Sequence, residues 1–310
     1  MEQVEKIKKK EVKNIMTNTF NGASKYAHEL DRMIVQESKT GFLADSKFKA
    51  RFTGARTVNM PQIDFDGLGD YSRESGYSKG GTNFTYNSYT LTKERSKQLT
   101  IDAQDADETG VSSIVGKMVG EYTRTKVNPE IDAYALSTLY DVANEKGNVD
   151  TYVANNAVET MLGCINKAEA ASGYTNERMV AFVDPVMYAA LMTSDKLQHS
   201  ITVGDFEQGA VDMKVKELNG CAIIPVAADR MRTEYEFNET GFEAKSGAGF
   251  IKAIVIPKSA ASLVKKVDKV DVYSPDQVQD MDAYKINFRL YYDLFVMNNK
   301  KGLIFAISGE

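Results

Sequence analysis

The sequence predicts an α+β protein, in which strands and helices are separate in one region and alternate in another. Residues 89–101 repeat with the period of two that is typical of an extended strand. Apolar residues then recur at helical spacing between Val111 and Leu139. After about residue 150, short apolar runs alternate with helical patterns, and long strand-like stretches follow them.

The strand over residues 84–101 has polar side chains on both faces in its middle. Lys93, Arg95 and Lys97 occupy one face, and Glu94 lies on the other. A strand with so many charges has little core to pack against, so we expect it to stand away from the body and to meet another chain. These four residues are therefore candidate contacts between subunits.

A glycine-rich segment, residues 66–81, predicts the mobile tip of a long hairpin. Residues 57–65 form the outgoing strand and residues 84–101 return, while the glycines permit the positive φ values of a tight reversal. The segment has neither GxGxxG nor GxxxxGK[ST] spacing, which argues against nucleotide binding. Seven tip residues are further candidate subunit contacts: Gly67, Tyr71, Arg73, Tyr77, Lys79, Gly80 and Gly81.

Four closely spaced carboxylates predict the start of a long helix, because acidic groups cap free amides and interact favourably with the helix dipole. They are Asp102, Asp105, Asp107 and Glu108. Pro129 is expected to break or restart this helix, and Gly147 is well placed to end it. The same carboxylates suit a calcium ion, but their spacing is not that of an EF-hand, and helix capping explains them more simply.

The middle of the chain predicts an α/β unit. Residues 179–183 form a short apolar strand, and Pro185 opens a helix directly after it. The pair Asn219-Gly220 favours a type I′ turn between two strands. The continuous apolar run 250–256 is typical of a central strand covered on both faces.

The C-terminal part predicts β structure. Residues 263–273 and 284–296 have strand patterns, with tyrosines and phenylalanines concentrated around the second. A turn at 298–302 is expected to bring residues 303–307 back to pair with that second strand. We expect this hairpin to pack on the long helix.

The composition is that of an ordinary soluble protein, with 43% hydrophobic and 26% charged residues. No run approaches eighteen apolar residues, and no apolar stretch follows the lysine-rich start, so neither a membrane span nor a secretory signal is predicted. Synthesis in a cytoplasm follows. The two cysteines, Cys164 and Cys221, are then expected to be buried free thiols, with a disulfide as the lesser alternative.

The net charge of −5 is unevenly distributed along the chain. The first 60 residues carry twelve Lys and Arg against seven Asp and Glu, which leaves the remainder strongly acidic. A basic arm can lie against the acidic body of a neighbouring subunit or against nucleic acid, and the charge count does not choose between them. The run KIKKKEVK is short and lacks interleaved aromatic residues, which favours the subunit contact.

The residues needed for common catalytic and metal chemistry are scarce. The two histidines, His28 and His199, stand in no motif, so a hydrolase built on a histidine base is not predicted. Cysteines and histidines are too widely spaced for a zinc site. No cofactor is predicted.

Four segments carry a resemblance to a known family. They are LTKERSKQLTIDAQDADETG with MVGEYTRTKVNPEIDAYALSTLYDVA, then AFVDPVMYAALMTS, KVKELNGCAIIPVAADRM and KINFRLYYDLFVMNNKKGLIFAIS. In this order they resemble the major capsid proteins of tailed double-stranded DNA bacteriophages, whose fold encapsulins share, from about Arg56 onward. The resemblance implies five parts: an N-terminal arm (1–55), an extended hairpin loop (56–101), the spine helix of a peripheral domain (102–148), an axial domain (149–258) and a C-terminal β part of the peripheral domain (259–310).

The resemblance also implies a structural function. Copies would form the pentamers and hexamers of an icosahedral shell that encloses phage double-stranded DNA, in the virion, after assembly in the cytoplasm of the bacterial host. Expected partners are a portal, DNA bound without sequence specificity, and a separate scaffolding protein, because the chain has no room for a scaffolding segment of its own. An encapsulin-like compartment is the alternative reading, and an α/β enzyme of unknown activity is a remote one.

Some capsids of this family join their subunits covalently by an isopeptide bond between Lys and Asn. Lys79 at the hairpin tip and Asn298 or Asn299 near the C-terminal strands are the corresponding residue types here. No motif marks them, so a cross-link remains an open possibility. A ladder of covalent oligomers after boiling in detergent would reveal it.

Overall fold

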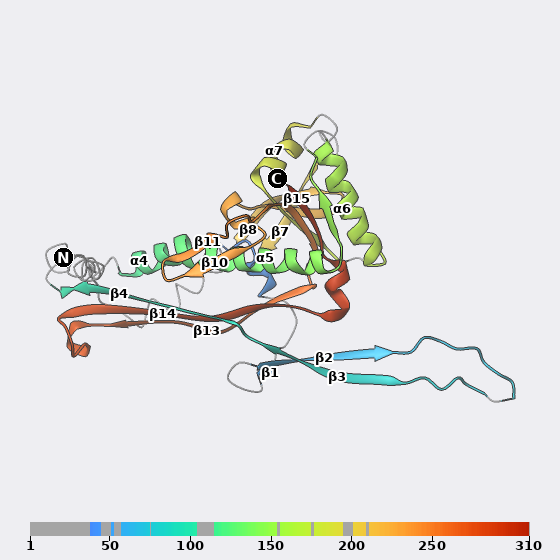
Figure 1. Cartoon of the computed structure of the whole chain (residues 1–310), viewed down its shortest axis with the longest axis horizontal. Helices are drawn as coiled ribbons and strands as arrows, with labels where there is room; N and C mark the ends of the chain where they lie inside the picture. Colours follow the sequence, from blue (N-terminus) through green and yellow to red (C-terminus); the bar gives the residue numbers. More distant parts are fainter. Residues whose placement is uncertain are drawn as a thin grey trace, which may run out of the picture.

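The computed structural model describes residues 38–44, 51–52, 57–74, 76–103, 115–153, 156–174, 177–194, 201–208 and 211–309. Most of the predicted arm (1–55) lies outside these residues, as do Asp105, Asp107 and Glu108 of the acidic cluster. The described chain has three visible parts: a long narrow sheet with a helix along it, an α/β body at one end, and a hairpin that extends beyond both (Figure 1).

The predicted hairpin is present. Strands β2 (Thr57–Phe65) and β3 (Thr82–Thr90) pair antiparallel along their whole length, and the short β1 (Arg51–Phe52) adds to the base of β2. Beyond its base, this ribbon extends away from the rest of the molecule (Figure 1). The glycine-rich segment forms its tip, as the sequence predicts.

The prediction of one return strand over residues 84–101 is wrong, because this segment forms two separate strands, β3 and β4. After β3, Leu91 inserts its side chain into an apolar cluster and is 2% exposed. The chain then continues as β4 (Lys93–Asp102), which pairs with β14 (Ala283–Val296) in a three-stranded sheet with the order β13-β14-β4. The outer strand β13 (Ala261–Tyr273) agrees with the predicted strand at 263–273. Asp102, predicted to cap a helix, ends β4 instead.

The long helix lies along this sheet (Figure 1). It consists of α4 (Val115–Tyr122), a π-helical turn η4 (Thr123–Val127) and α5 (Asn128–Glu145). Pro129 stands in the first turn of α5, as predicted, because a proline there lacks only an amide that a helix N-terminus does not need. Gly147 has a φ of 71° just after α5, which confirms its predicted role as the helix stop.

The α/β body contains a seven-stranded sheet with the order β5-β15-β12-β6-β9-β8-β7. The strands are β5 (Val149–Thr151), β6 (Met179–Val183), β7 (Ile201–Gln208), β8 (Val211–Leu218), β9 (Cys221–Pro225), β12 (Phe250–Pro257) and β15 (Phe305–Gly309). The predicted turn joins β8 to β9, with positive φ values of 51° at Asn219 and 75° at Gly220. Strand β12 is central, as predicted.

The predicted pairing of the last strand is wrong. After the 3-10 turn η9 (Asn298–Leu303), β15 does not fold back on β14 but pairs with β12 and with β5 of the body. The physical reason is burial on both faces, because Ile304, Ala306 and Ile307 are all fully buried. Such a strand fits the interior of a covered sheet better than an exposed hairpin.

The body sheet is covered on both faces by helices. Val180, Phe182 and Ile254 pack with α5 on one face. Ala181 and Val255 pack on the other face with α6 (Ala157–Ala171) and α7 (Pro185–Thr193), whose first residue is the predicted Pro185. The first of these clusters also includes apolar residues of β14, so one continuous core joins the body to the long sheet through α5.

Smaller elements complete the described chain. A two-stranded hairpin, β10 (Tyr235–Asn238) and β11 (Gly241–Ala244), lies beside α5 (Figure 1). Three short 3-10 turns are η2 (Gly41–Leu43), η7 (Ala228–Arg230) and η8 (Pro275–Gln277). None of the helices in the described part of the chain has the length and apolar character needed to cross a bilayer.

Candidate assembly surface

Local hydrogen bonds connect the described residues of the hairpin tip. The Gly81 amide donates a hydrogen bond of 2.6 Å to the Asp66 carboxylate. Ser72 and Gly76 exchange two backbone hydrogen bonds of 3.1 and 2.8 Å, and Gly76 has a φ of 80°, which favours glycine. These hydrogen bonds join residues within the tip to one another.

Large apolar side chains at the tip remain in solvent. Tyr71 and Tyr77 contact each other edge to face at 5.3 Å between ring centroids, yet they are 63% and 88% exposed. Leu68 is fully exposed. Contiguous exposed apolar groups are typical of interaction surfaces.

The structure places all seven predicted tip residues in this exposed segment. They are Gly67, Tyr71, Arg73, Tyr77, Lys79, Gly80 and Gly81. Their location on the projecting tip agrees with the sequence analysis, and their role as subunit contacts stays a prediction. The cross-link suggested for Lys79 with Asn298 or Asn299 likewise stays a prediction.

The other four candidates lie on the body and not on the free part of the hairpin. Lys93, Glu94, Arg95 and Lys97 belong to β4, which is bonded to β14 along its length. Lys93 lies 4.1 Å from the Phe237 ring centroid, and the Lys97 ammonium group donates to the Glu239 carbonyl at 3.2 Å. The expectation that β4 stands away from the body is therefore wrong, because its charged side chains contact other residues of the same chain.

Arg95 shows how such a charged strand can join a core. Its guanidinium donates to both Glu130 oxygens, at 2.7 and 3.3 Å, and to the carbonyls of Asn238 and Gly241 in the β10–β11 turn. The hydrogen bond to Glu130 raises the pKa of Arg95 further above its usual value. Burial and the nearby Glu130 charge raise the pKa of Tyr292, whose hydroxyl donates to the same carboxylate at 3.4 Å. This cluster ties β4, α5, β14 and the β10–β11 turn together.

The root of the hairpin is fixed by one buried carboxylate that the sequence analysis did not single out. Asp293 on β14 is 4% exposed and accepts hydrogen bonds from the Thr92 amide at 2.8 Å and the Thr92 hydroxyl at 2.9 Å. The Tyr134 hydroxyl of α5 donates to it at 2.5 Å. Because Thr92 lies between β3 and β4, Asp293 fixes the point where the hairpin leaves the body.

A second buried carboxylate anchors the described end of the N-terminal segment. Asp132 on α5 is fully buried and accepts hydrogen bonds from the Ser38 hydroxyl, the Lys39 amide, and the amide and hydroxyl of Thr40, at 2.7 to 3.1 Å. Arg230 also pairs with it at 3.1 Å. The chain is thus attached to α5 at residues 38–40, a contact that the sequence does not predict.

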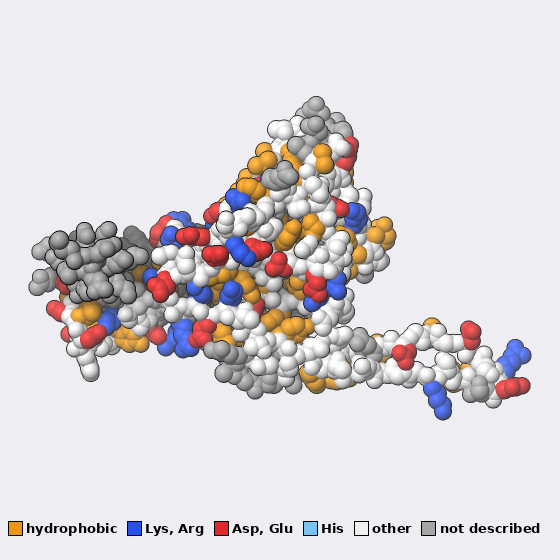
Figure 2. Space-filling view, viewed as in Figure 1, with side chains coloured by type: hydrophobic (Ala, Val, Ile, Leu, Met, Phe, Trp, Pro, Cys, Tyr) orange, Lys and Arg blue, Asp and Glu red, His pale blue; other side chains and the backbone are white. Residues whose placement is uncertain are grey.

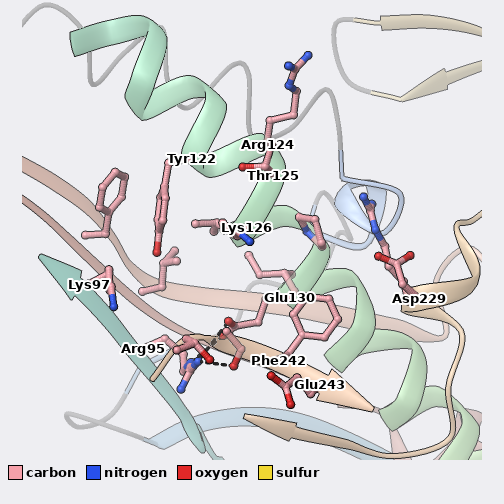
Figure 3. Close-up of a pocket in the computed structure, with 18 of the residues that line it drawn as sticks. Arg95, Lys97, Tyr122, Arg124, Thr125, Lys126, Glu130, Asp229, Phe242 and Glu243 are labelled. Carbon is pink, nitrogen blue, oxygen red and sulfur yellow. Dashed lines mark hydrogen bonds and ion pairs between the residues drawn. The ribbon is translucent and has the colours of Figure 1, made fainter. Parts of the chain in front are cut away.

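A cleft of about 780 Å³ lies between β4, the long helix and the β10–β11 hairpin (Figure 3). Figure 3 shows Lys126 and Tyr122 directed into it from the helix, above the Arg95–Glu130 pair. Neither histidine nor cysteine is among the described residues that line it, so the cleft offers no thiol or imidazole for nucleophilic catalysis. His28 and His199 lie outside the described residues.

The remaining chemical expectations concern metals and thiols. Within the described ranges, no group of three or more His, Cys, Asp or Glu is placed to hold a metal ion. Three of the four acidic residues considered for calcium lie outside those ranges. Cys164 and Cys221 are both free and buried, as predicted, and burial raises the pKa of Cys164 to about 12, which makes its thiol inert at neutral pH.

Comparison with solved structures addresses the fold. The capsid structure of the cyanophage P-SCSP1u matches with a TM-score of 0.55 at 12% identity, over 84% of this chain and 85% of that chain. The mature capsid of bacteriophage PhiM1 matches with a TM-score of 0.53 at 12% identity, over 86% of each chain. The chain has the phage capsid fold.

Other comparisons show how far this capsid fold has diverged in sequence. A structure from Mycobacterium phage Ogopogo matches with a TM-score of 0.53 at 13% identity, over 86% of this chain and 91% of that chain. No protein-family model matches the chain, and no curated protein matches it. The similarity therefore resides in the arrangement of elements, and the fold predicted from the four sequence segments is confirmed.

Proposed function

We propose that the chain is a structural subunit whose copies assemble into the closed icosahedral shell that encloses phage double-stranded DNA in the virion. The observation that supports this most directly is the hairpin β2–β3, which projects from a capsid-fold body and exposes apolar side chains at its tip. A hairpin of two strands is only marginally stable by itself. Its exposed length is best explained by a neighbouring copy that supports it.

The parts of the chain correspond to roles in such a shell. The hairpin is the extended loop, α4 and α5 form the spine helix, and the sheet β13-β14-β4 completes a peripheral domain. The seven-stranded sheet with α6 and α7 is the axial domain, which would surround the five-fold and six-fold axes. Strand β15 transfers the C-terminal part of the chain from the peripheral sheet to this axial sheet.

The mechanism is the geometry of contacts and not chemistry at a catalytic site. Each copy would use different patches toward different neighbours, so that rings close as pentamers and hexamers. Apolar burial contributes roughly 25 cal/mol per Å² before ordering costs are subtracted. Many modest contacts of this size add up over a closed shell.

The expected partners follow from assembly of this kind. They are a separate scaffolding protein that guides curvature, a portal at one vertex, and DNA held without sequence specificity. Assembly would take place in the cytoplasm of the bacterial host. Neither an enzymatic reaction nor a cofactor is part of the proposal.

Deletion of the hairpin tip tests this function. Removing residues 67–81 leaves every strand and helix of the body intact, so we expect a folded, soluble subunit that no longer assembles. Negative-stain electron microscopy and sedimentation of the wild-type and deleted chains, expressed with the phage's scaffolding protein, would measure this. Closed shells from the deleted chain would refute the role of the tip, and a wild-type chain that stays monomeric would refute the shell function itself.

The content of the particles separates the proposal from an encapsulin-like compartment. Particles purified from phage-producing cells should protect double-stranded DNA from added nuclease. Mass spectrometry that instead finds a packaged enzyme and no nucleic acid would favour the compartment.

A further inference from the structure

The outer part of the hairpin has two chemically different faces. In the antiparallel register, Pro61 lies opposite Tyr86, Ile63 opposite Phe84, and Phe65 opposite Thr82. Directly paired residues share a face, and residues two apart on one strand do so as well. Five of these six residues are apolar, so they form one continuous patch, which we call the apolar face.

The apolar face is in solvent. Phe65 is 74% exposed, Tyr86 is 58%, Phe84 is 51% and Ile63 is 49%. The rings of Phe84 and Tyr86 contact each other edge to face at 5.1 Å, which keeps both rings on this surface. A patch of this kind is costly to leave in water unless something covers it.

The opposite face, which we call the polar face, needs no such cover. Gln62 lies opposite Thr85 there, and the Asn87 amide donates a hydrogen bond of 2.5 Å to the Gln62 side chain. Nearer the root, Tyr89 belongs to this face and packs on Phe295 of the body at 5.1 Å. The polar face is therefore the one on the side of the chain's own body, and the body does not cover the apolar face.

The chemistry of the apolar face indicates what covers it. Residues 59–65 and 82–88 contribute neither Lys nor Arg to this face. Nucleic acid and anionic lipid are both bound mainly through such cations. The charged side chains of the outer hairpin lie mostly toward its tip (Figure 2). An apolar protein surface is the partner that an uncharged aromatic patch fits.

The size of the patch favours another copy of this chain in a ring. If a fully exposed aromatic side chain presents about 200 Å², the apolar face offers roughly 400 Å² for burial. A stable two-protein interface needs about 800 Å² from each partner. The patch is therefore too small to hold a partner alone, but it is sufficient where several other contacts hold the same neighbour, as in a closed ring.

We infer that the hairpin binds with one side only: its apolar face lies on a second copy of the chain, and its polar face stays in solvent in the assembled shell. This inference rests on the proposed function and adds the side and the chemistry of the contact. Sidedness also fixes how the ribbon must be rotated about its long axis when it meets the neighbour.

Two neighbouring cross-strand pairs provide a matched experiment. Ile63→Asp with Phe84→Asp adds two charges to the apolar face, and Gln62→Asp with Thr85→Asp adds the same two charges one residue along, on the polar face. We expect the first double variant to lose at least tenfold in shell yield and the second to assemble like the wild type. Shell yield is measured by sedimentation and electron microscopy at equal protein concentration, and far-UV circular dichroism checks that both monomers fold.

A labelling experiment tests the same inference without added charge. Ile63→Cys and Gln62→Cys each place one reactive thiol on a known face, while the native cysteines are buried. Both cysteines should react with maleimide in the monomers, and labelling should drop at least tenfold on assembly only for Ile63→Cys.

These experiments distinguish failure of the one-sided contact from failure of the proposed shell function. Equal assembly by both charged variants, or equal protection at both cysteines, would overturn the sidedness while leaving the shell function intact. Binding of the wild-type monomer to neutral phosphatidylcholine vesicles, lost in Ile63→Asp with Phe84→Asp, would overturn the choice of a second copy as the partner. Failure of the wild-type chain to form shells would instead refute the proposed function.

Discussion

Replacement of Asp293 by alanine should destabilise the unassembled subunit strongly. The carboxylate is 4% exposed and accepts hydrogen bonds from Thr92, from Tyr134 and from the Leu294 amide. Truncation removes the acceptor while the donors stay partly buried, so each donor loses its partner without full compensation from water.

The magnitude follows from the two groups that connect other elements to Asp293. A hydrogen bond to a charged group contributes about 2 kcal/mol. Counting one such bond from Thr92 and one from Tyr134 gives a loss of about 4 kcal/mol in the free energy of unfolding. Tyr134→Phe removes one of these two hydrogen bonds and should cost about 2 kcal/mol.

Urea denaturation followed by far-UV circular dichroism measures these values. Glu94→Ala is the matched control. It removes a carboxylate from the adjacent strand whose pair with Arg289 is largely exposed, so it should cost less than about 1 kcal/mol. Hydrogen exchange should also quicken at the Thr92 amide in Asp293→Ala. If Asp293→Ala and Glu94→Ala have the same stability, the reasoning about the hairpin root is wrong.

Two further results are expected. Asp132→Ala should lower the free energy of unfolding by about 3 kcal/mol, because five donors lose a fully buried acceptor. The same variant should make residues 38–44 accessible to limited proteolysis, whereas Asp141→Ala, on the exposed side of the same helix, should have neither effect. Burial raises the pKa of Tyr292, so the folded chain keeps this proton above pH 10, where the unfolded chain loses it. This residue alone should therefore lower the free energy of unfolding there by up to about 1.4 kcal/mol per pH unit. Urea denaturation between pH 9 and 11 should show that the free energy of unfolding falls less steeply in Tyr292→Phe than in the wild type. Tyr174→Phe is the control and should behave like the wild type, since Tyr174 is 74% exposed. Equal slopes for the wild type and both variants would contradict the role given to Tyr292.

Features set by local chemistry could be predicted from the sequence. Strand β6 coincides with the short apolar run MVAFV, Pro185 begins α7, and Asn219-Gly220 forms the turn between β8 and β9. Each depends on φ preferences or on residues adjacent in the sequence. The projecting hairpin with its glycine-rich tip belongs to the same class.

Features set by distant partners could not be predicted. Nothing near Arg95 in the sequence shows that Glu130 and the β10–β11 turn surround it, so the pattern of charges predicts a free strand where the structure has a paired one. The pairing of β15 with β12 is of the same kind, because periodicity predicts a strand but not its neighbour.

A usable signal existed for the two buried carboxylates. Asp293 interrupts the run LYYDLFV, and Asp132 interrupts the apolar pattern of NPEIDAYAL. A single acid in such a run is rarely buried without partners, so it marks a position where other segments must supply donors. The partners themselves, Thr92 and Ser38, can be identified only from the fold.

The position of β15 has a consequence for the order of events during synthesis. This strand is made some fifty residues after β12, yet it lies between β12 and β5 and helps bury the core under α5. A nascent chain still on the ribosome lacks it and leaves one edge of β12 open. Completion of this sheet and of the core beneath α5 therefore waits until residues 305–309 have been synthesised.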